Sequence, residues 1–406
     1  MIRKNKKDSY SQLFGSMAIA ILIGAQYLNT ILGLYINSSE EGYLILIIGI
    51  VIILSVISFI YRPNVIVNIK YPALLGIIIV AFLLTVSLTN GKSDLFIADF
   101  LGMCLVPLIC GGVLQPDFKK VLSYCMWMII LSIPVANDLF AKSNMGQEYD
   151  AIKMNVSYAI VPIIGAGMLH FFFYRKESNI FEKLLYVVLA LITIMFVAMS
   201  YRGALVALMV VLFAGFMFSG NIKWRTIKRT ISITLCFFII IFLLLVDINS
   251  VLLKVSTFFH SNNINIAFID KTSFLSSTGS LLQGRLDIWQ SAIQGFKESP
   301  LYGHGMATFQ SYTGYPFPHN IILQFLFDGG LLLAIPLLGY VANGVIRSFS
   351  VIRIVNRDKF ILILLLLCIS LTRAMMSAEV WRIMLLWLFM GMVTSDYSKN
   401  SRNEIT

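Results

Sequence analysis

Charged residues are scarce in this chain. They make up 13% of its 406 residues, about half of the roughly 25% usual in soluble globular proteins. Hydrophobic residues account for 58%, and the mean hydropathy is +0.84. These values exclude an ordinary soluble domain. Because runs of roughly 20 apolar residues recur along the chain, the sequence predicts an all-α, polytopic integral membrane protein.

Cysteine and histidine are also rare, with five and four residues. All five cysteines fall in apolar runs, and none belongs to a CxxC pair, so they read as small buried hydrophobic residues. The histidines are scattered, and no carboxylates accompany them at the spacing of metal ligands. We therefore predict no metal site and no cofactor. The cysteines are Cys104, Cys110, Cys125, Cys236 and Cys368.

The hydropathy pattern predicts about twelve membrane-spanning helices. The predicted spans cover residues 11–30, 43–60, 72–90, 95–114, 119–139, 154–173, 183–199, 203–219, 228–246, 320–343, 360–377 and 381–395. The first span follows a basic start but has no evident small-residue cleavage site, and further spans follow it directly. It is therefore interpreted as a helix of the protein and not as a cleavable signal peptide.

The net charge of +11 could suggest a nucleic-acid partner, but its distribution argues against one. Most of the 31 Lys and Arg residues fall in the segments that a cytoplasmic N-terminus places inside the cell. Such a bias is a topology signal, and these residues can also contact anionic lipid heads. We expect a multi-pass protein of the bacterial cytoplasmic membrane, with both termini in the cytoplasm and no nucleic-acid partner.

Three regions follow from this pattern. Residues 1–246 carry helices 1–9, residues 247–319 form a large extracytoplasmic loop, and residues 320–406 carry helices 10–12 and a cytoplasmic tail. Loops longer than about 15 residues are usually functional or disordered. We expect this one to be functional, because it contains apolar and aromatic residues.

The second half of the large loop has helical periodicity over residues 281–296. Leu282, Leu286, Trp289 and Ile293 share one face, which predicts an amphipathic helix lying at the membrane interface. Glycine and proline residues follow it up to the next span. The Gly303-His304-Gly305 piece is interpreted as a turn and not as a phosphate-binding loop, because no strand precedes it.

His319 is the first candidate for chemistry. It stands at the end of the large loop, in Pro318-His319-Asn320, where the chain re-enters the membrane. Ionisable residues at such a boundary are candidates for function, and a neutral imidazole can accept a proton near pH 7. The alternative is a structural or interfacial histidine.

Two arginines in separate outer turns suggest an anionic ligand. Arg202 lies between the seventh and eighth spans, and Arg285 lies in the amphipathic piece of the large loop. The guanidinium fork binds phosphate through two parallel hydrogen bonds and keeps its charge. Alternatively, Arg202 caps a helix or reaches lipid phosphates, and Arg285 belongs to a solvated helix face.

The last outer turn is also basic. Arg373 and Arg382 flank it, with Glu379 between them. We expect at least one of these arginines to help line the same outer cavity. The alternative is that both pair with Glu379 or with lipid heads.

An enzyme on the outer face has no ATP, so the free energy for its reaction must arrive with the substrate, and we expect that substrate to be a lipid diphosphate. Two arginines would hold the diphosphate and stabilise the charge that develops as it leaves. A histidine nearby would take the proton from an attacking hydroxyl.

Together these residues resemble the O-antigen ligase and polymerase superfamily of bacterial envelope glycosyltransferases. Ser200-Tyr201-Arg202-Gly203 is similar to the family's serine–arginine–glycine turn at the start of a span. The run of Gly284-Arg285, Trp289, Pro300, Gly303 and Gly305 resembles its large-loop motif. His319-Asn320, Leu323, Asp328 and Gly330 resemble its "HN..L..L.E.G" motif. These motifs cover residues 197–335, and the first half of the chain is similar only in hydropathy.

The resemblance implies a GT-C-like membrane fold with a large loop between helices 9 and 10, and metal-independent transfer from undecaprenyl diphosphate. Arg202 and Arg285 would contact the lipid diphosphate, and His319 would activate the acceptor hydroxyl. Asn320 and Asp328 would support the site, together with Arg373 and Arg382. Asp328 stands where the family usually has glutamate, so the charge is kept.

Three activities fit this resemblance. A polymerase joins undecaprenyl-diphosphate-linked oligosaccharide units into capsule, exopolysaccharide or O-antigen. A ligase moves a finished glycan to lipid A core, and an oligosaccharyltransferase moves it to a protein. The chain shows no appended domain for a protein acceptor, and its Ile, Lys and Asn content suits many hosts, including those without lipid A. We predict a polymerase, with a flippase and a chain-length regulator as partners.

A lipid-linked sugar transporter is an alternative from another class. Transporters often contain internal repeats and polar residues near the membrane midplane. Here the charged candidates gather at the outer face, and the sequence has no evident repeat.

Overall fold

The computed structural model describes residues 6–36, 41–62, 69–89, 97–133, 150–200, 202–219, 257, 261 and 285–395. Within these residues every regular element is helical. Six helices are long and apolar enough to cross a membrane, or seven if the bent pair at the N-terminal end forms one span. The predicted all-α membrane class is confirmed.

The predicted spans that fall in the described residues each coincide with a helix or a short series of helices. Some of these helices are shorter than a full span, such as Gly203–Phe218 and Met384–Thr394. The predicted ninth span, 228–246, lies outside the described residues. The count of twelve and the GT-C-like arrangement therefore stay predictions.

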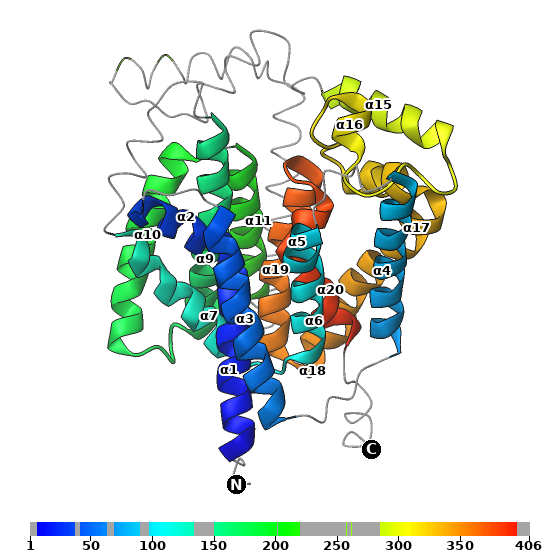
Figure 1. Cartoon of the computed structure of the whole chain (residues 1–406). Coiled ribbons are helices and arrows are strands. Elements are labelled where there is room, and N and C mark those ends of the chain that lie inside the picture. The colour runs from blue at the N-terminus through cyan, green and yellow to red at the C-terminus, as the bar shows by residue number, and fades with distance from the viewer. Residues whose placement is uncertain are drawn as a thin grey trace. The chain divides into compact units, whose positions relative to one another are not determined.

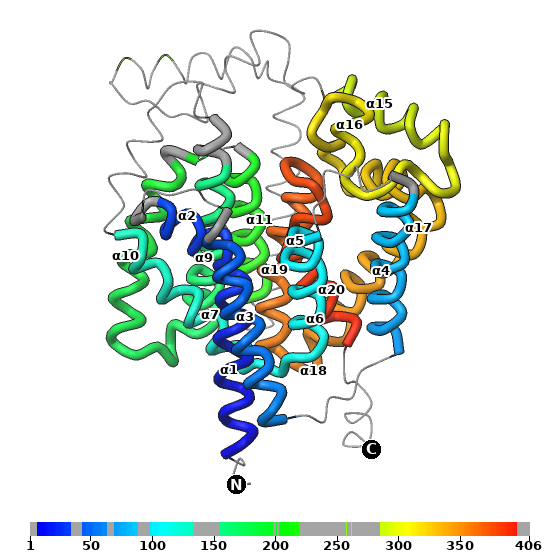
Figure 2. The backbone as a smooth tube through the Cα atoms, in the orientation of Figure 1, coloured from blue at the N-terminus to red at the C-terminus, as the bar shows by residue number. Residues whose placement is uncertain are grey.

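The contacts of the chain form two compact units. The first comprises Met1–Cys125 and Arg285–Thr406, and the second comprises Met126–Gly284. Figures 1 and 2 show the helices of both units. The three-region division predicted from the sequence, 1–246, 247–319 and 320–406, is a division by membrane topology and stays a prediction.

The N-terminal part of the first unit consists of helices that follow one another closely. They are α1 (Lys6–Ile23), α2 (Ala25–Ile36), α3 (Glu41–Tyr61), α4 (Lys70–Thr89), α5 (Ile97–Asp99), η1 (Phe100–Leu105), α6 (Val106–Val113) and α7 (Phe118–Trp127). The first two are bent by 64° to each other. α1 packs along α3, as Figure 2 shows.

The C-terminal part of the first unit follows the large loop. Its helices are α15 (Arg285–Glu298), α16 (Phe309–Thr313), α17 (Ile321–Arg347), η4 (Ser348–Ile352), α18 (Arg353–Val355), α19 (Arg357–Met376), η5 (Val380–Arg382) and α20 (Met384–Thr394). α20 is buried along its whole length between α6 and α19. A Cβ on Gly391 would lie 2.2 Å from the Leu108 carbonyl oxygen, so the glycine allows the backbones of α20 and α6 to touch, as small residues do between membrane helices.

The described part of the second unit contains four helices. They are η2 (Met128–Ser132), α9 (Asp150–Tyr174), α10 (Ile180–Met199) and α11 (Arg202–Phe218). α9 packs against both α10 and α11. Asn179 and Glu182 form a capping box that starts α10, in which each side chain satisfies a free backbone N–H at the helix start.

Candidate functional site

The site is built where α17 begins. Asn320 is its N-cap, and the side-chain oxygen accepts hydrogen bonds from the N–H groups of Ile322 and Leu323, at 2.9 and 3.2 Å. This satisfies donors that no helical carbonyl can reach. The role of Asn320 in the site is therefore structural, because it determines where α17 begins.

His319 directly precedes this cap and has a φ of 54°. A left-handed backbone is uncommon for residues other than glycine, and Asn, Asp and His adopt it most readily. Such a conformation persists only where the surroundings hold it, and it is frequent at functional sites. Here Trp289 of α15 provides one restraint, because its Nε1–H donates to the carbonyl oxygen of Pro318 at 3.0 Å.

His319 and Arg285 meet at one backbone oxygen. The Nδ1 of His319 lies 3.1 Å from the carbonyl oxygen of Met376, and the Arg285 guanidinium donates to the same oxygen at 2.9 Å. Met376 is the last residue of α19, and carbonyl groups at a helix C-terminus lack intrahelical donors. The structure thus brings together two of the predicted site residues, from α15 and from the start of α17.

The bond to Met376 also fixes the tautomer of His319. A carbonyl oxygen only accepts, so the Nδ1 of His319 must carry the proton. In the neutral ring this leaves the lone pair on Nε2, which has no partner within the described part of the chain. Nε2 is therefore the atom that can accept a proton.

Three effects act on the pKa of His319. Burial lowers it first, the positive charge of Arg285 lowers it further, and the hydrogen bond to Met376 raises it. The net result is a pKa below the ordinary value of 6.5. Because a lowered pKa means that the proton is bound only at more acidic pH, His319 is neutral at pH 7.

This direction predicts the pH profile of a reaction that uses His319 as a base. The acidic limb of the kcat/KM profile should lie below pH 6.5, since that limb reports the essential base of the free enzyme. Replacing Arg285 by methionine removes the positive charge and should move the limb to higher pH. The profile is measured between about pH 4.5 and 8 with residual activity. If the acidic limb of Arg285→Met lies at the same pH as that of the wild type, the charge of Arg285 does not lower the pKa of His319.

α15 is held on α17 by an apolar cluster. Ile288, Ala292, Phe309 and Phe327 are buried together, with Leu323 against them. Figure 1 shows α15 and α16 at one end of α4 and α17. The predicted helix is confirmed over Arg285–Glu298.

The face of α15 that packs on α17 differs from the predicted apolar face. Leu286 and Ile293 are exposed, at 53% and 42%, and Leu282 lies outside the described residues. The helix therefore carries a second apolar face, which the cluster on α17 leaves uncovered.

The chain after α15 docks into a break in α17. Gly329 and Gly330 have non-helical backbone angles, and Gly330 has a φ of 58° and a ψ of −157°, a region that only glycine readily adopts. The N–H of Leu331 bonds to the carbonyl of Pro300 at 2.9 Å. In return, the N–H of Gly305 bonds to the Asp328 carbonyl at 2.8 Å.

This docking explains the glycines that the sequence singled out. A Cβ on Gly303 would lie 2.5 Å from the backbone nitrogen of Gly329, and one on Gly330 would lie 2.4 Å from the carbonyl carbon of Leu301. The N–H groups of His304 and Gly305 bond to carbonyls of α17. The segment is therefore a turn that joins the large loop to α17, as the sequence favoured.

We expect Gly330→Ala to destabilise the protein by about 1–3 kcal/mol, because the new methyl group meets backbone and the φ becomes strained. Gly339→Ala is the matched control on the same helix, where a Cβ would meet nothing within 4 Å. It should be neutral or slightly stabilising, by up to about 1 kcal/mol. Thermal midpoints of the purified variants in detergent test this. Equal thermal midpoints for the two variants would contradict the close contact between Gly330 and the chain after α15.

Asp328 joins α17 to the segment after α19. Its Oδ2 accepts a hydrogen bond from the Trp381 indole at 2.6 Å, and Gln324, one turn earlier, accepts from the N–H of Val380 at 3.0 Å. Both bonds hold η5, four residues beyond Met376. Asp328 therefore contributes to the position of the Met376 carbonyl through this segment.

Arg373 and Arg382 already have partners. Arg382 pairs with Asp99 at 3.0 Å and with Glu379 at 3.5 Å. The Arg373 Nη1 donates to the side-chain oxygen of Gln26 at 2.5 Å. The pairing of Arg382 matches the alternative raised from the sequence, and the role of Arg373 and Arg382 in lining a cavity stays a prediction.

Arg202 belongs to the second unit. It is the first residue of α11, but its side chain lies outside the described residues, so its contact with a diphosphate stays a prediction. Its neighbour Gly203 is buried, and a Cβ there would lie 1.9 Å from the Tyr158 hydroxyl oxygen. The glycine of this motif thus lets α11 pack closely on α9.

Sequence reasoning missed Gln324, Met376 and Trp381. Gln324 and Asp328 gave a usable signal, because two polar residues four positions apart in an apolar run share one helix face. Met376 acts through its backbone, so its side chain gave no signal. Within the described residues, no group of three or more potential metal ligands is present.

Comparison with known proteins yields one family. Residues 185–338 match the family described as O-antigen ligase, and no curated protein matches the chain. The matched range includes Arg202, Arg285, His319 and Asp328, the residues on which the resemblance was based. The match over residues 185–338 supports the O-antigen ligase and polymerase superfamily for this part of the chain.

Proposed function

We propose that the protein is a membrane glycosyltransferase that polymerises undecaprenyl-diphosphate-linked oligosaccharide units on the outer face of the bacterial cytoplasmic membrane. The products would be capsule, exopolysaccharide or O-antigen. The observation that carries the proposal is the meeting of His319 and Arg285 at the Met376 carbonyl. Both side chains belong to the range that matches the O-antigen ligase family. Their meeting combines a neutral base and a fixed cation in one small region.

The proposed step is a single displacement at a sugar carbon. An acceptor hydroxyl attacks the anomeric carbon of the donor sugar and passes its proton to the Nε2 of His319. The bond between that carbon and the diphosphate oxygen breaks, and the lipid diphosphate leaves with the electron pair. The histidine then returns the proton to solvent. Because Nδ1 is held by Met376, the ring keeps Nε2 available for each turnover.

Arg285 would stabilise the leaving diphosphate. The guanidinium group has five N–H donors, and the bond to Met376 uses a donor on Nη2. The remaining donors can form a bidentate pair with phosphate oxygens. Arg202, which the family motif includes, would supply the second positive charge. Fixed cations aimed at the developing charge are among the largest contributions to catalysis.

The test is transfer by the purified protein. Reconstituted protein is supplied with an undecaprenyl-diphosphate-linked repeat unit, and the products are separated by size. We expect a ladder of lengthened glycans, and we expect the ladder to persist with a metal chelator present. Donor that crosses the vesicle membrane without any new glycosidic bond would overturn the proposal and support the transporter alternative.

The ligase remains a second candidate, because the matched family carries the description O-antigen ligase. A ligase uses the same donor chemistry with a different acceptor. Supplying finished polymer on undecaprenyl diphosphate together with lipid A core separates the two activities. A single transfer to lipid A core without a ladder would favour the ligase.

A further inference from the structure

Three side-chain hydrogen bonds join the beginning of α17 to the end of α19 and the segment that follows it. Each bond links a side chain of residues 319–328 with a group of residues 376–381. The pairs are His319 with the Met376 carbonyl at 3.1 Å, Gln324 with the Val380 N–H at 3.0 Å, and Asp328 with the Trp381 indole at 2.6 Å. The two segments are therefore joined at three successive points, and Gln324 provides the middle bond.

The amide group of Gln324 uses both of its ends. The side chain is 2% exposed, although glutamine is mostly found at the surface. Its oxygen accepts from the N–H of Val380, and its NH2 group donates to the Asp328 carboxyl. Val380 is buried and is the first residue of η5, so no carbonyl within that helix can accept from its N–H. Without Gln324, this buried donor would lose its partner, which is costly.

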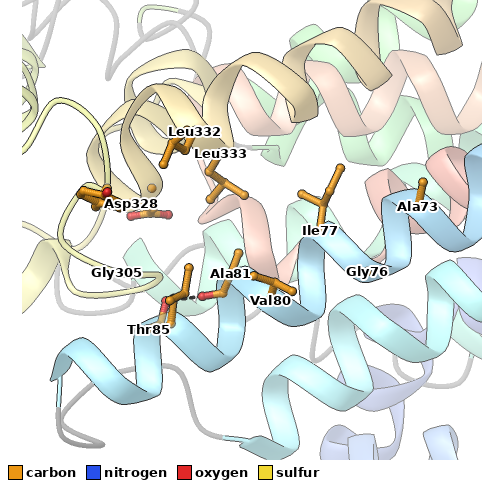
Figure 3. A pocket seen from close by; sticks show the side chains of 13 residues that line it. Ala73, Gly76, Ile77, Val80, Ala81, Thr85, Gly305, Asp328, Leu332 and Leu333 are labelled. Carbon is orange, nitrogen blue, oxygen red and sulfur yellow. Dashed lines mark hydrogen bonds between the residues drawn. The ribbon is translucent and has the colours of Figure 1, made fainter.

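The first turns of α17 depend on such bonds for their position. Gly329 and Gly330 interrupt the helix directly after Asp328, so the part that begins beside His319 is not continuous with the rest of α17. Toward α4, Asp328 borders a pocket of about 480 Å³, which Figure 3 shows between the two helices. The bonds to residues 376–381 therefore contribute to holding these turns against α19.

The tautomer of His319 depends on the same contact. A neutral imidazole can carry its proton on either ring nitrogen, and a hydrogen bond at one nitrogen selects the tautomer. Here the acceptor is the Met376 carbonyl. Gln324 lies five residues after His319, and Val380 lies four residues after Met376. The bond between Gln324 and Val380 therefore restrains both partners of the bond at His319.

We propose that Gln324 is a positioning residue for His319. Through Val380 it keeps the Met376 carbonyl within reach of Nδ1, and this leaves the lone pair on Nε2 to accept a proton. Gln324 itself does not touch the substrate. The inference rests on the proposed role of His319 as the base, and it adds a residue that determines whether that base is in its competent form.

The direct test is the tautomer of His319 in Gln324→Met, which has a side chain of similar length without hydrogen-bonding groups. Nitrogen-15 NMR of histidine-labelled protein reports the tautomer, because a protonated ring nitrogen and one with a lone pair give well-separated signals. The chain has four histidines, and the spectrum of His319→Asn assigns the signal. At slightly alkaline pH we expect Nδ1–H alone in the wild type and a mixture of both tautomers in Gln324→Met.

The kinetic test follows from the same argument. A misplacement of about 1 Å at a catalytic group can lower the rate by about 10²-fold, so the kcat of Gln324→Met should fall by up to that factor. The KM for the donor should change little, because Arg285 keeps its charge. Gln294→Met on α15 is the matched control, since Gln294 is exposed and bonds to Glu298. It should keep the tautomer and the kcat of the wild type.

A double variant tests the hydrogen bonds themselves. Gln324→Glu combined with Asp328→Asn exchanges the amide and the carboxyl, so that oxygen atoms still accept from Val380 and Trp381 and an amide still joins the two side chains. We expect this variant to recover the Nδ1–H tautomer. If Gln324→Met does not fold, Gln324→Asn replaces it, because its amide is one methylene too short to reach Val380.

A purely structural role for Gln324 predicts a different result. The thermal midpoint of Gln324→Met would fall, while the folded protein would keep the Nδ1–H tautomer and its kcat, and this would overturn the proposal. A folded double variant with mixed tautomers would also overturn it. The tautomer is measured without donor or acceptor. A failure of the positioning role can therefore be distinguished from a failure of glycan transfer by the wild type.

Discussion

Replacing His319 by alanine is expected to reduce glycan transfer by a factor of about 10²–10⁴, the usual contribution of a positioned general base. The loss should appear in kcat, because the histidine acts on the proton that leaves during the attack. The measurement is the initial rate of donor consumption by reconstituted protein, normalised to the amount of folded protein.

The backbone at His319 needs its own control, because φ is 54° there. Asparagine adopts this conformation about as readily as histidine, so His319→Asn keeps the local geometry and removes the base. Both variants should lose transfer to a similar extent. Gln310→Ala, an exposed position on α16, should retain it. Near-normal transfer by His319→Asn would exclude the role of general base.

Replacing Arg285 by lysine is expected to lower kcat/KM by about 10²–10³-fold, as loss of a donor to a developing oxyanion does. Lysine keeps the charge, but it offers a point charge where the fork of arginine can bind Met376 and a phosphate at once. Arg285→Ala should be at least as impaired. Retention of most activity by the lysine variant would show that bidentate binding is not needed.

Lys297 provides the matched control for Arg285. It lies on the same helix, α15, and is an exposed basic residue. Lys297→Ala removes one positive charge from the same segment without touching Met376, so transfer should be unchanged. A similar loss in both variants would mean that the overall charge of α15, and not the position of Arg285, determines the effect.

The sequence predicted the helical membrane class because its signal is repeated along the whole chain. Apolar runs of about 20 residues leave few alternatives in a bilayer. Most predicted span limits within the described residues lie within a few residues of the helix ends. The predicted first span, 11–30, is an exception, because two helices bent by 64° occupy it. The break in α17 was not predicted, because Gly329-Gly330 in an apolar run is tolerated by many straight helices.

The site was predicted in part. Arg285 and His319 were predicted from residue type and position. Their shared contact was not predicted, because the oxygen belongs to Met376 at the end of α19, which is distant in the sequence. The burial of Asp328 against Trp381 was likewise not readable, because both belong to separate apolar segments. The partners of Arg382 were predicted only in part. Glu379 is close in the sequence and was named as a partner, whereas Asp99, the last residue of α5, is distant in the sequence and was not.

The shared carbonyl of Met376 makes the two groups a single mechanical element. The carbonyl oxygen has two lone pairs, so it accepts from the imidazole and from the guanidinium at the same time. Both groups are therefore positioned by one backbone atom. Substitutions elsewhere on the outer surface that change the acceptor glycan can thus leave the distance between the base and the cation unchanged.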